Sequence, residues 1–150
     1  MRESAKPTIV FASDHGGINL REILQKEAKN AGYIVEDCGT NGLDSVDYPD
    51  QVGLAIESFF RLNAKYLVLV CGSGVGVSIA ANRHPKMRAV MAVNTTQARL
   101  SREHNHANCL CLGERLTGID LAKEIFYCFV NTDPDMSERH CRRVTKLENV

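Results

Sequence analysis

The chain has 150 residues, enough for a domain with its own core, and 44% of them are hydrophobic. Its 18 Lys and Arg residues balance 18 Asp and Glu residues, which gives no argument for a nucleic acid or an anionic membrane as partner. No apolar stretch approaches the ~20 residues that span a bilayer, and the polar start Met1–Pro7 lacks the apolar core of a signal peptide. We therefore expect a cytoplasmic protein with a single domain over residues 1–150.

Strand-like and helix-like segments alternate along the chain. Short apolar runs are each followed by a segment whose apolar residues recur with the helical period. The expected strands are 8–13, 33–37, 65–70, 88–93 and 108–112. The expected helices are 16–31, about 47 to 62, 75–82, 95–103 and 118–130, with a last helix that starts at Ser137.

This alternation predicts an α/β fold of the Rossmann-like type: a three-layer αβα sandwich with a five-stranded parallel sheet, helices on both faces and an added C-terminal helix. Ligands of such sheets bind beyond the carboxyl ends of the strands, near the point where the strand order reverses. The residues that follow the expected strands are therefore the first candidates for a site. They are Asp14–Gly17, Cys71–Gly76, Asn94, Thr95 and Gly113–Arg115.

The segment 71–76, CGSGVG, follows the third expected strand and opens the next helix. Its three glycines allow successive backbone N–H groups to point into one concavity, a nest that binds an anion. The anion could be a phosphate or an oxyanion that develops during a reaction, and a tight turn without a ligand is the alternative. The spacing fits neither a Walker loop, nor a cysteine-dependent phosphatase loop, nor a dinucleotide-binding fingerprint.

Three further features bear on the chemistry. A thiol at a helix N-terminus, as expected for Cys71, has a lowered pKa and can act as a nucleophile or a general base, although a buried inert thiol is the common case. The six cysteines contain no C-x-x-C pair, so we expect reduced thiols. His104 and His106 lack a third ligand at suitable spacing, so we predict no metal site. Arg139 and Arg143 share one helix face and could clamp a phosphate.

Together these motifs resemble the ribose-5-phosphate isomerase B family, which also includes the subunits of galactose-6-phosphate isomerase. The resemblance runs from Ile9 to about Val144. The motifs that carry it are Ala12–Gly17 (ASDHGG), Asp47–Pro49 (DYP), Cys71–Arg83 (CGSGVGVSIAANR), Leu100–Asn105 (LSREHN), Leu112–Arg115 (LGER) and Arg139–Arg143 (RHCRR). It implies interconversion of D-ribose 5-phosphate and D-ribulose 5-phosphate through a cis-enediolate, without metal or organic cofactor. Members without the cysteine carry a glutamate at the position of Val77, so this chain looks like the thiolate subtype.

The resemblance also implies roles for individual residues. Cys71 would be the base that moves the proton, and His104 would donate a proton to open the sugar ring. Asp14 and Ser73 would assist them. The amides of the glycine loop would stabilise the enediolate, Asn105 would hold sugar hydroxyls, and a histidine and three arginines would bind the phosphate. The full expected substrate-binding set is Asp14, His15, Tyr48, Gly72, Ser73, Gly74, Val75, Gly76, Asn105, Arg115, Arg139 and Arg143. The family works as a homodimer or a homotetramer with sites shared between subunits, so the C-terminal helix would serve a neighbour's site.

Other functions remain open from the sequence. A hexose 6-phosphate, such as allose or galactose 6-phosphate, could be the substrate, because the same base and nest would serve. A sugar-phosphate-binding regulator would keep the nest and the arginines but would have no need of Cys71 and His104. A thiol redox protein would need a C-x-x-C partner for Cys71, which the sequence does not supply. The Cys, His and Arg set in one chain favours the ribose-phosphate enzyme.

Overall fold

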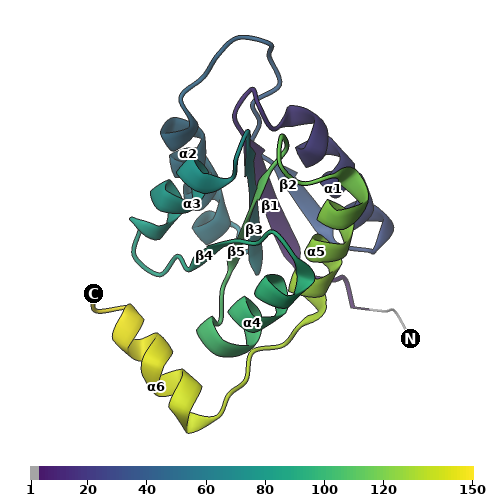
Figure 1. The fold of residues 1–150 in the computed structure, drawn as a ribbon. Coiled ribbons are helices and arrows are strands. Elements are labelled where there is room, and N and C mark those ends of the chain that lie inside the picture. Colours follow the sequence, from purple (N-terminus) through teal and green to yellow (C-terminus); the bar gives the residue numbers. More distant parts are fainter. Residues whose placement is uncertain (1–3) are drawn as a thin grey trace.

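Five parallel strands form the middle layer of the molecule, with helices on both faces (Figure 1). The computed structural model describes residues 4–150. The strands are β1 (Thr8–Ser13), β2 (Ile34–Asp37), β3 (Tyr66–Cys71), β4 (Ala89–Met91) and β5 (Cys109–Gly113). The helices are α1 (Ile18–Asn30), α2 (Tyr48–Arg61), α3 (Val75–Asn82), α4 (Thr95–Asn105), α5 (Ile119–Asn131) and α6 (Glu138–Leu147). The predicted α/β fold, including its C-terminal helix, is confirmed.

The strand order β2-β1-β3-β5-β4 places the reversal of the sheet between β1 and β3. The chain leaves β1 for β2 on one side and then crosses to β3 on the other side. The loops after β1 and β3 therefore diverge, and ligands of such sheets bind at the carboxyl ends of these two strands. In the register, Ser13 pairs with Val70, and Cys71 pairs with Gly113, so the ends of β1, β3 and β5 lie close to one level.

Alternating strand residues face two separate hydrophobic clusters. Val10, Leu67 and Leu69 pack with α2 and α3 on one face, whereas their neighbours in the strands pack with α1, α4 and α5 on the other. The helices match this because their apolar residues recur on one side, as Val52, Ala55, Ile56 and Phe59 do in α2. Full burial of one large aliphatic side chain stabilises a fold by about 1.5–3 kcal/mol, so the two clusters hold the sheet ends rigidly.

The observed elements differ from the expected ones mainly at their ends. Helix α1 starts at Ile18 and not at Gly16, because Gly16 and Gly17 form the turn that follows β1. Strand β4 covers three residues and not six, because it is an edge strand that pairs only with β5. Helix α4 continues to Asn105, where His106 adopts the left-handed conformation and ends it.

Helix α6 extends away from the body of the molecule, at the lower left of Figure 1. His140 is the buried residue of this helix. Leu147 at its end and Met136, just before its start, are exposed. A helix with so little contact inside its own chain has surface available for another molecule. Among the described residues 4–150, no helix is both long enough and apolar enough to cross a bilayer.

Candidate active site

Cys71 is the last residue of β3, and its side chain is only 5% exposed. The backbone N–H of Gly74 donates a hydrogen bond to its sulfur at 3.1 Å. Gly74 precedes α3 with φ +79°, and a Cβ there would lie 2.9 Å from the carbonyl carbon of Leu112. The loop can thus turn back onto the sulfur only with glycine at this position. A hydrogen-bond donor and the N-terminus of α3 thus lie beside the sulfur.

The loop after β1 packs directly against this glycine loop. Asp14, 9% exposed, accepts a hydrogen bond from the N–H of Gly16 at 2.9 Å. A Cβ on Gly16 would lie 3.4 Å from the backbone nitrogen of Gly72, and one on Gly17 would lie 2.6 Å from the carbonyl of Val70. The glycines of the DHGG motif therefore let the start of α1 pass close beside β3.

The loop after β5 supports the nest from the other side. The backbone N–H of Glu114 donates to the carbonyl of Cys71 at 2.9 Å, and that of Arg115 donates to the carbonyl of Gly72 at 3.0 Å. The Arg115 guanidinium reaches within 3.4 Å of the Cβ position of Gly72. The positive charge of Arg115 thus lies beside the backbone amides of the glycine loop, which would bind an anion.

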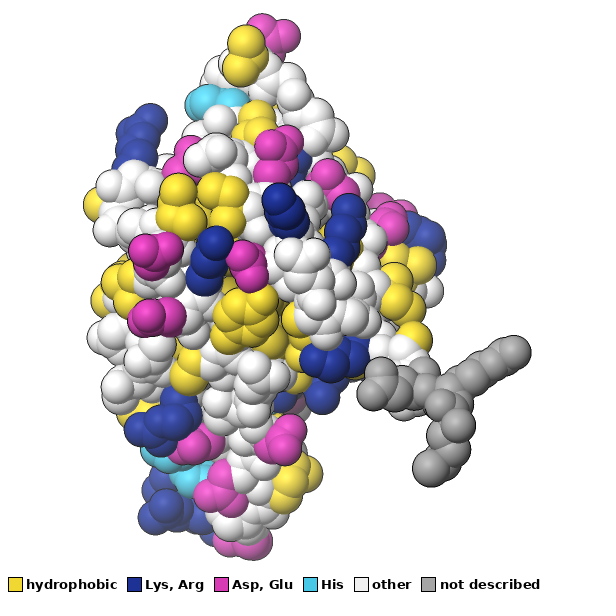
Figure 2. Space-filling model, turned by 90° about the vertical axis from the view of Figure 1, so that its right-hand side faces the viewer, with side chains coloured by type: hydrophobic (Ala, Val, Ile, Leu, Met, Phe, Trp, Pro, Cys, Tyr) yellow, Lys and Arg dark blue, Asp and Glu magenta, His cyan; other side chains and the backbone are white. Residues whose placement is uncertain are grey.

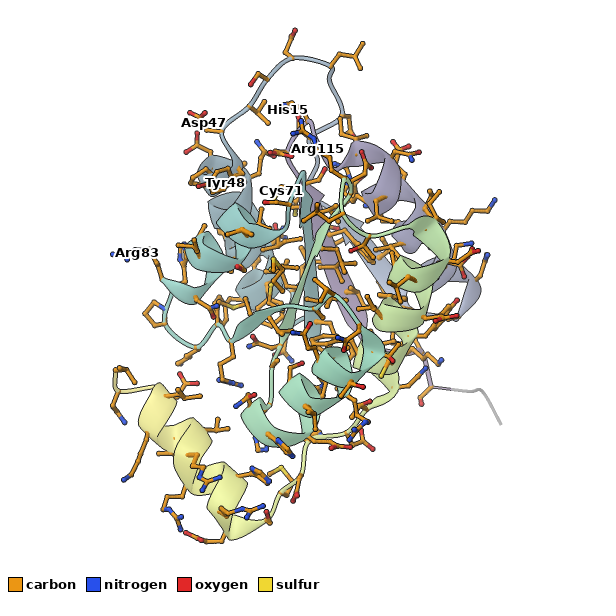
Figure 3. The ribbon with its side chains drawn as sticks, viewed as in Figure 1. His15, Asp47, Tyr48, Cys71, Arg83 and Arg115 are labelled. Carbon is orange, nitrogen blue, oxygen red and sulfur yellow. The ribbon has the colours of Figure 1, made fainter. Side chains whose placement is uncertain are left out.

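Two more predicted residues, His15 and Tyr48, lie near Cys71 and Arg115 at the same end of the sheet (Figure 3). Nδ1 of His15 accepts a hydrogen bond from the N–H of Val46 at 3.3 Å. The ring of Tyr48, the first residue of α2, lies against Gly76, where a Cβ would approach Cζ to 2.6 Å. A hollow of about 350 Å³ opens next to this contact, and Ile79 of α3 also lines it.

The other predicted residues form a second group at the opposite end of the sheet. His104 and Asn105 end α4, and the Asn105 carbonyl accepts a hydrogen bond at 3.1 Å from Arg88, which precedes β4. This is the amino end of the strands, because the chain must return there before β5 begins. Strand β5 separates the two ends by about 13 Å, at ~3.3 Å per residue. Arg139 and Arg143 lie on α6 beside the same end.

The region around the second group is basic and contains further histidines. Figure 2 shows Lys, Arg and His side chains gathered at the lower end of the molecule, where α4 and α6 lie. The rings of His104 and His140 stack, with centroids 4.6 Å apart and an interplanar angle of 8°. Burial lowers the pKa of His140, and the Asp135 carboxylate, 3.6 Å from its Nε2, acts in the opposite direction. A backbone hydrogen bond from Ser137 lowers the pKa of Asp135.

Comparison with known proteins identifies the family of this chain. A family model described as ribose/galactose isomerase matches residues 9–147. The chain belongs to this family. The predicted resemblance is thereby confirmed.

Relatives align with almost the whole chain. Ribose-5-phosphate isomerase B of Escherichia coli is 37% identical over 142 residues, which cover 93% of each chain. D-erythrulose-4-phosphate isomerase 2 of Mycolicibacterium smegmatis is 39% identical, also with 93% of each chain covered. The solved structure of ribose-5-phosphate isomerase B from Clostridium thermocellum superimposes with a TM-score of 0.91 at 42% identity and covers 95% of each chain.

The isomerase chain therefore carries its predicted site residues in two groups that a single copy does not bring together. The first group comprises Asp14, His15, Tyr48, the loop Cys71–Gly76 and Arg115. The second group comprises His104, Asn105, Arg139 and Arg143. In the described part of the chain, no set of three or more His, Cys, Asp or Glu side chains is placed to hold a metal ion.

The structural roles of two supporting residues, Glu114 and Arg21, were not predicted from the sequence. Glu114 accepts a hydrogen bond at 2.5 Å from the N–H of Leu20 and so caps α1 from a distant loop. Arg21 is fully buried and bonds to the loop that leads to Tyr48, and its only sequence signal is its place between apolar residues of α1. By contrast, the apolar segments around Cys109 and Cys111 predict thiols that serve as small hydrophobes. Both are buried, and burial raises the pKa of Cys111.

Proposed function

We propose that the protein interconverts D-ribose 5-phosphate and D-ribulose 5-phosphate, with the thiolate of Cys71 as the base. The supporting observation is the placement of the Cys71 sulfur inside the glycine nest, within 3.1 Å of the Gly74 amide. In the open-chain aldose, the thiolate removes the C2 proton, and the electron pair passes to the carbonyl oxygen to form a cis-enediolate. The proton of the O2 hydroxyl passes to O1, and the proton held by Cys71 is returned to C1 as the C2 carbonyl forms, which gives the ketose.

The nest supplies what this reaction requires besides a base. A proton next to a carbonyl is weakly acidic, so the negative charge that develops on oxygen must be stabilised in the transition state. The first amides of α3 have no acceptor within the helix, and the Gly74 amide just before it donates to the sulfur of Cys71. One well-placed donor of this kind contributes about 3 kcal/mol to catalysis.

Substrate binding follows from the charges around the nest. Arg115 and His15 lie near Cys71 (Figure 3) and would hold the phosphate. Ser73, within the nest, and Tyr48, which lies against Gly76, would contact the sugar. Asp14 lies beside the nest with one carboxylate oxygen bonded to Gly16. These residues bind and orient the substrate so that C1 and C2 lie next to the sulfur of Cys71.

We propose further that a second copy of the chain completes each site, in a homodimer or in a homotetramer. His104, Asn105, Arg139 and Arg143 cannot reach the nest of their own chain, since they lie at the other end of the sheet. Next to the nest, α3 exposes the apolar side chains of Val75 and Ile79, which is typical of a surface that meets another subunit. Helix α6 extends outward and would carry its arginines to the neighbouring nest (Figure 1).

An isomerase assay tests the proposal. Wild type should convert D-ribose 5-phosphate to D-ribulose 5-phosphate in the presence of EDTA, and Cys71→Ala should lose at least about 10³-fold in kcat while its fold is retained. Allose 6-phosphate and D-erythrose 4-phosphate serve as parallel substrates. Turnover of only one of these parallel substrates would support the mechanism and refute D-ribose 5-phosphate as the substrate. A fully active Cys71→Ala would refute the role of Cys71 as the base.

A further inference from the structure

The side chain of His140 is buried on a helix that is otherwise exposed. It is 4% exposed, whereas its neighbours Arg139 and Arg142 face solvent. The ring lies flat against His104, at 4.6 Å and 8°. His104 itself stays exposed. One face of the His104 ring is therefore covered by His140, and the rest of the side chain remains free to meet a substrate.

Asp135 fixes the position of His140 from the start of α6. Its carboxylate lies 3.6 Å from Nε2 of His140 and accepts a hydrogen bond from the N–H of Ser137 at 2.8 Å. Its backbone N–H donates to the carbonyl of Glu103 at 3.0 Å, and its carbonyl lies 2.8 Å from Nε2 of His106. One residue thus ties the last turn of α4 to the first turn of α6.

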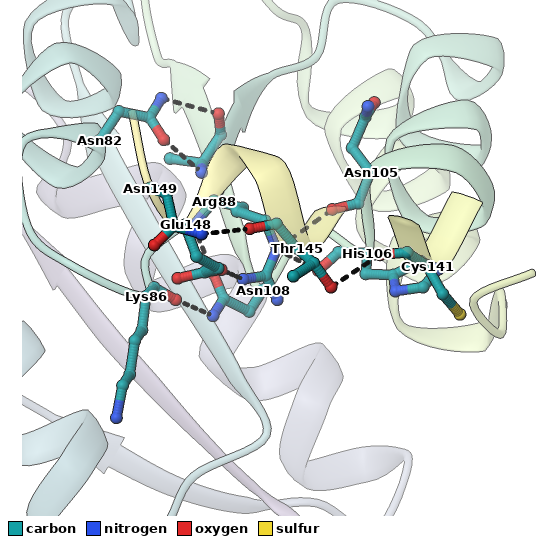
Figure 4. A network of polar contacts seen from close by, with 11 residues as sticks. Asn82, Lys86, Arg88, Asn105, His106, Asn108, Cys141, Thr145, Glu148 and Asn149 are labelled. Atoms are coloured by element: carbon teal, nitrogen blue, oxygen red, sulfur yellow. Dashed lines mark hydrogen bonds and ion pairs between the residues drawn. The ribbon is translucent and has the colours of Figure 1, made fainter. Parts of the chain in front are cut away.

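A second connection joins the far end of α6 to the same turn of α4 (Figure 4). Nε of Arg88 donates to the carbonyls of Asn105 and His106, at 3.1 Å each. The guanidinium of Arg88 also forms an ion pair with Glu148, directly after α6. These contacts hold α6 against the end of α4, where the rings of His104 and His140 stack.

We propose that His140 is a positioning residue that holds the His104 ring in the orientation needed to open the cyclic sugar. The inference rests on the proposed isomerase function. In ring opening, the C1–O4 bond breaks, O4 takes a proton from His104, and the proton of the O1 hydroxyl leaves to water as the carbonyl forms. An exposed histidine in the last turn of a helix otherwise samples several rotamers, and a small misplacement of a proton donor costs up to about 10²-fold in rate.

Two substrates separate ring opening from the later proton transfer. D-ribose 5-phosphate closes a ring through O4, so it must be opened before Cys71 can act. D-erythrose 4-phosphate cannot close such a ring, because its O4 carries the phosphate. A variant with a misplaced His104 should therefore lose activity on the pentose and keep it on the tetrose. Loss of fold lowers both activities equally, so the ratio of the two kcat/KM values is insensitive to it.

The kinetic arm compares three variants. His140→Ala should lower kcat for D-ribose 5-phosphate by about tenfold or more and leave the D-erythrose 4-phosphate reaction within about twofold of wild type. His140→Phe keeps a flat ring for stacking and should restore the wild-type ratio to within about threefold. Arg142→Ala, an exposed change on the same helix, should leave the ratio unchanged.

The spectroscopic arm is independent of activity. Proton NMR should show ring-current-shifted His104 imidazole signals in wild type and in His140→Phe, and their return toward ordinary positions in His140→Ala. An unchanged substrate ratio in His140→Ala overturns the inference, as does a ratio that His140→Phe fails to restore. If wild type converts neither sugar, the proposed function fails instead, and the positioning role falls with it.

Discussion

Cys71 and His104 lie at opposite ends of the sheet. Cys71 ends β3 and pairs with Gly113 at the carboxyl end of β5, whereas His104 stands in the last turn of α4, before β5 begins. About 13 Å of strand separates these ends. The proposed base and proton donor must both lie within hydrogen-bond reach of one sugar, so the proposal requires that two copies of the chain supply them.

Mixing two inactive variants should restore activity. Cys71→Ala and His104→Asn are each expected to be nearly inactive as pure proteins. In the proposed homodimer, mild dissociation and reassociation would leave about half of the dimers mixed, and each mixed dimer would have one site with both native residues. The expected recovery is about a quarter of wild-type activity in the D-ribose 5-phosphate assay.

The control mixes Cys71→Ala with Ser73→Ala, whose residues stand in the same loop. Every mixed site then lacks one of them, so no recovery beyond the activity of Ser73→Ala alone is expected. Recovery of activity in this control mixture would show that the site is not shared between copies. The absence of recovery in the mixture of Cys71→Ala with His104→Asn would show the same.

Gly74→Ala should damage both stability and activity. The residue has φ +79°, and its Cβ would meet backbone atoms of Leu112 at 2.9 Å, so the loop must shift away from Cys71. We expect a loss of about 1–3 kcal/mol in the free energy of unfolding and a fall in kcat. Gly53→Ala is the control, because Gly53 lies within α2 with no atom within 4 Å of its Cβ position. It should be neutral or stabilising by up to about 1 kcal/mol, as urea denaturation would show.

The sequence predicted the elements of the fold well because their signals are local. Apolar runs such as Leu67–Val70 and the periodic positions of α2 are visible in any short window of the chain. The glycine loop was equally clear, since three closely spaced glycines directly after a buried strand are typical of a tight turn into a helix. Strand β4 was predicted too long because pairing at a sheet edge depends on the neighbouring strand, and the sequence around Ala89 carries no mark of it.

The division of the site was harder to predict, because it depends on the direction of a helix and not on residue types. His104 and Asn105 belong to one motif with clear polar character, but only the return of α4 to the amino end of β5 separates them from Cys71. The stack of His104 on His140 arises from packing between α4 and α6. Such contacts between segments distant in sequence leave no local pattern.

Arg21 should contribute strongly to stability although it is charged. Its guanidinium is fully buried and donates to Ser13 Oγ at 2.6 Å and to the Thr40 carbonyl and Asn41 Oδ1 at 2.5 Å each. Arg21→Ala leaves these acceptors without a partner and opens a void, so we expect a loss of about 3 kcal/mol in the free energy of unfolding. The loop at residues 40–41 leads to Tyr48, so KM for the sugar phosphate should also rise.

Arg61→Ala is the matched control for Arg21. Arg61 pairs with Glu36 at 3.9 Å, and both side chains are well exposed, so its removal should cost less than about 0.5 kcal/mol. Equal shifts of the urea midpoint in the two variants would contradict the structural role of Arg21.

Acidification should weaken the protein through His140. Burial lowers its pKa from the ordinary value of 6.5, so the unfolded chain binds a proton more readily than the folded chain. Stability is therefore expected to fall as the pH drops from about 7 through 6.5 and to level off below the folded pKa. The groups that face His140 are His104 of α4, Asp135, and Arg139 and Arg143 of α6; among them, Asp135 alone favours the charged ring.

Urea denaturation between pH 7.5 and 5.5 should show a smaller loss of stability for His140→Phe than for wild type, because phenylalanine does not titrate. Identical slopes in the two proteins would show that His140 is as easily protonated in the fold as in the unfolded chain, and that its contact with His104 does not depend on a neutral ring.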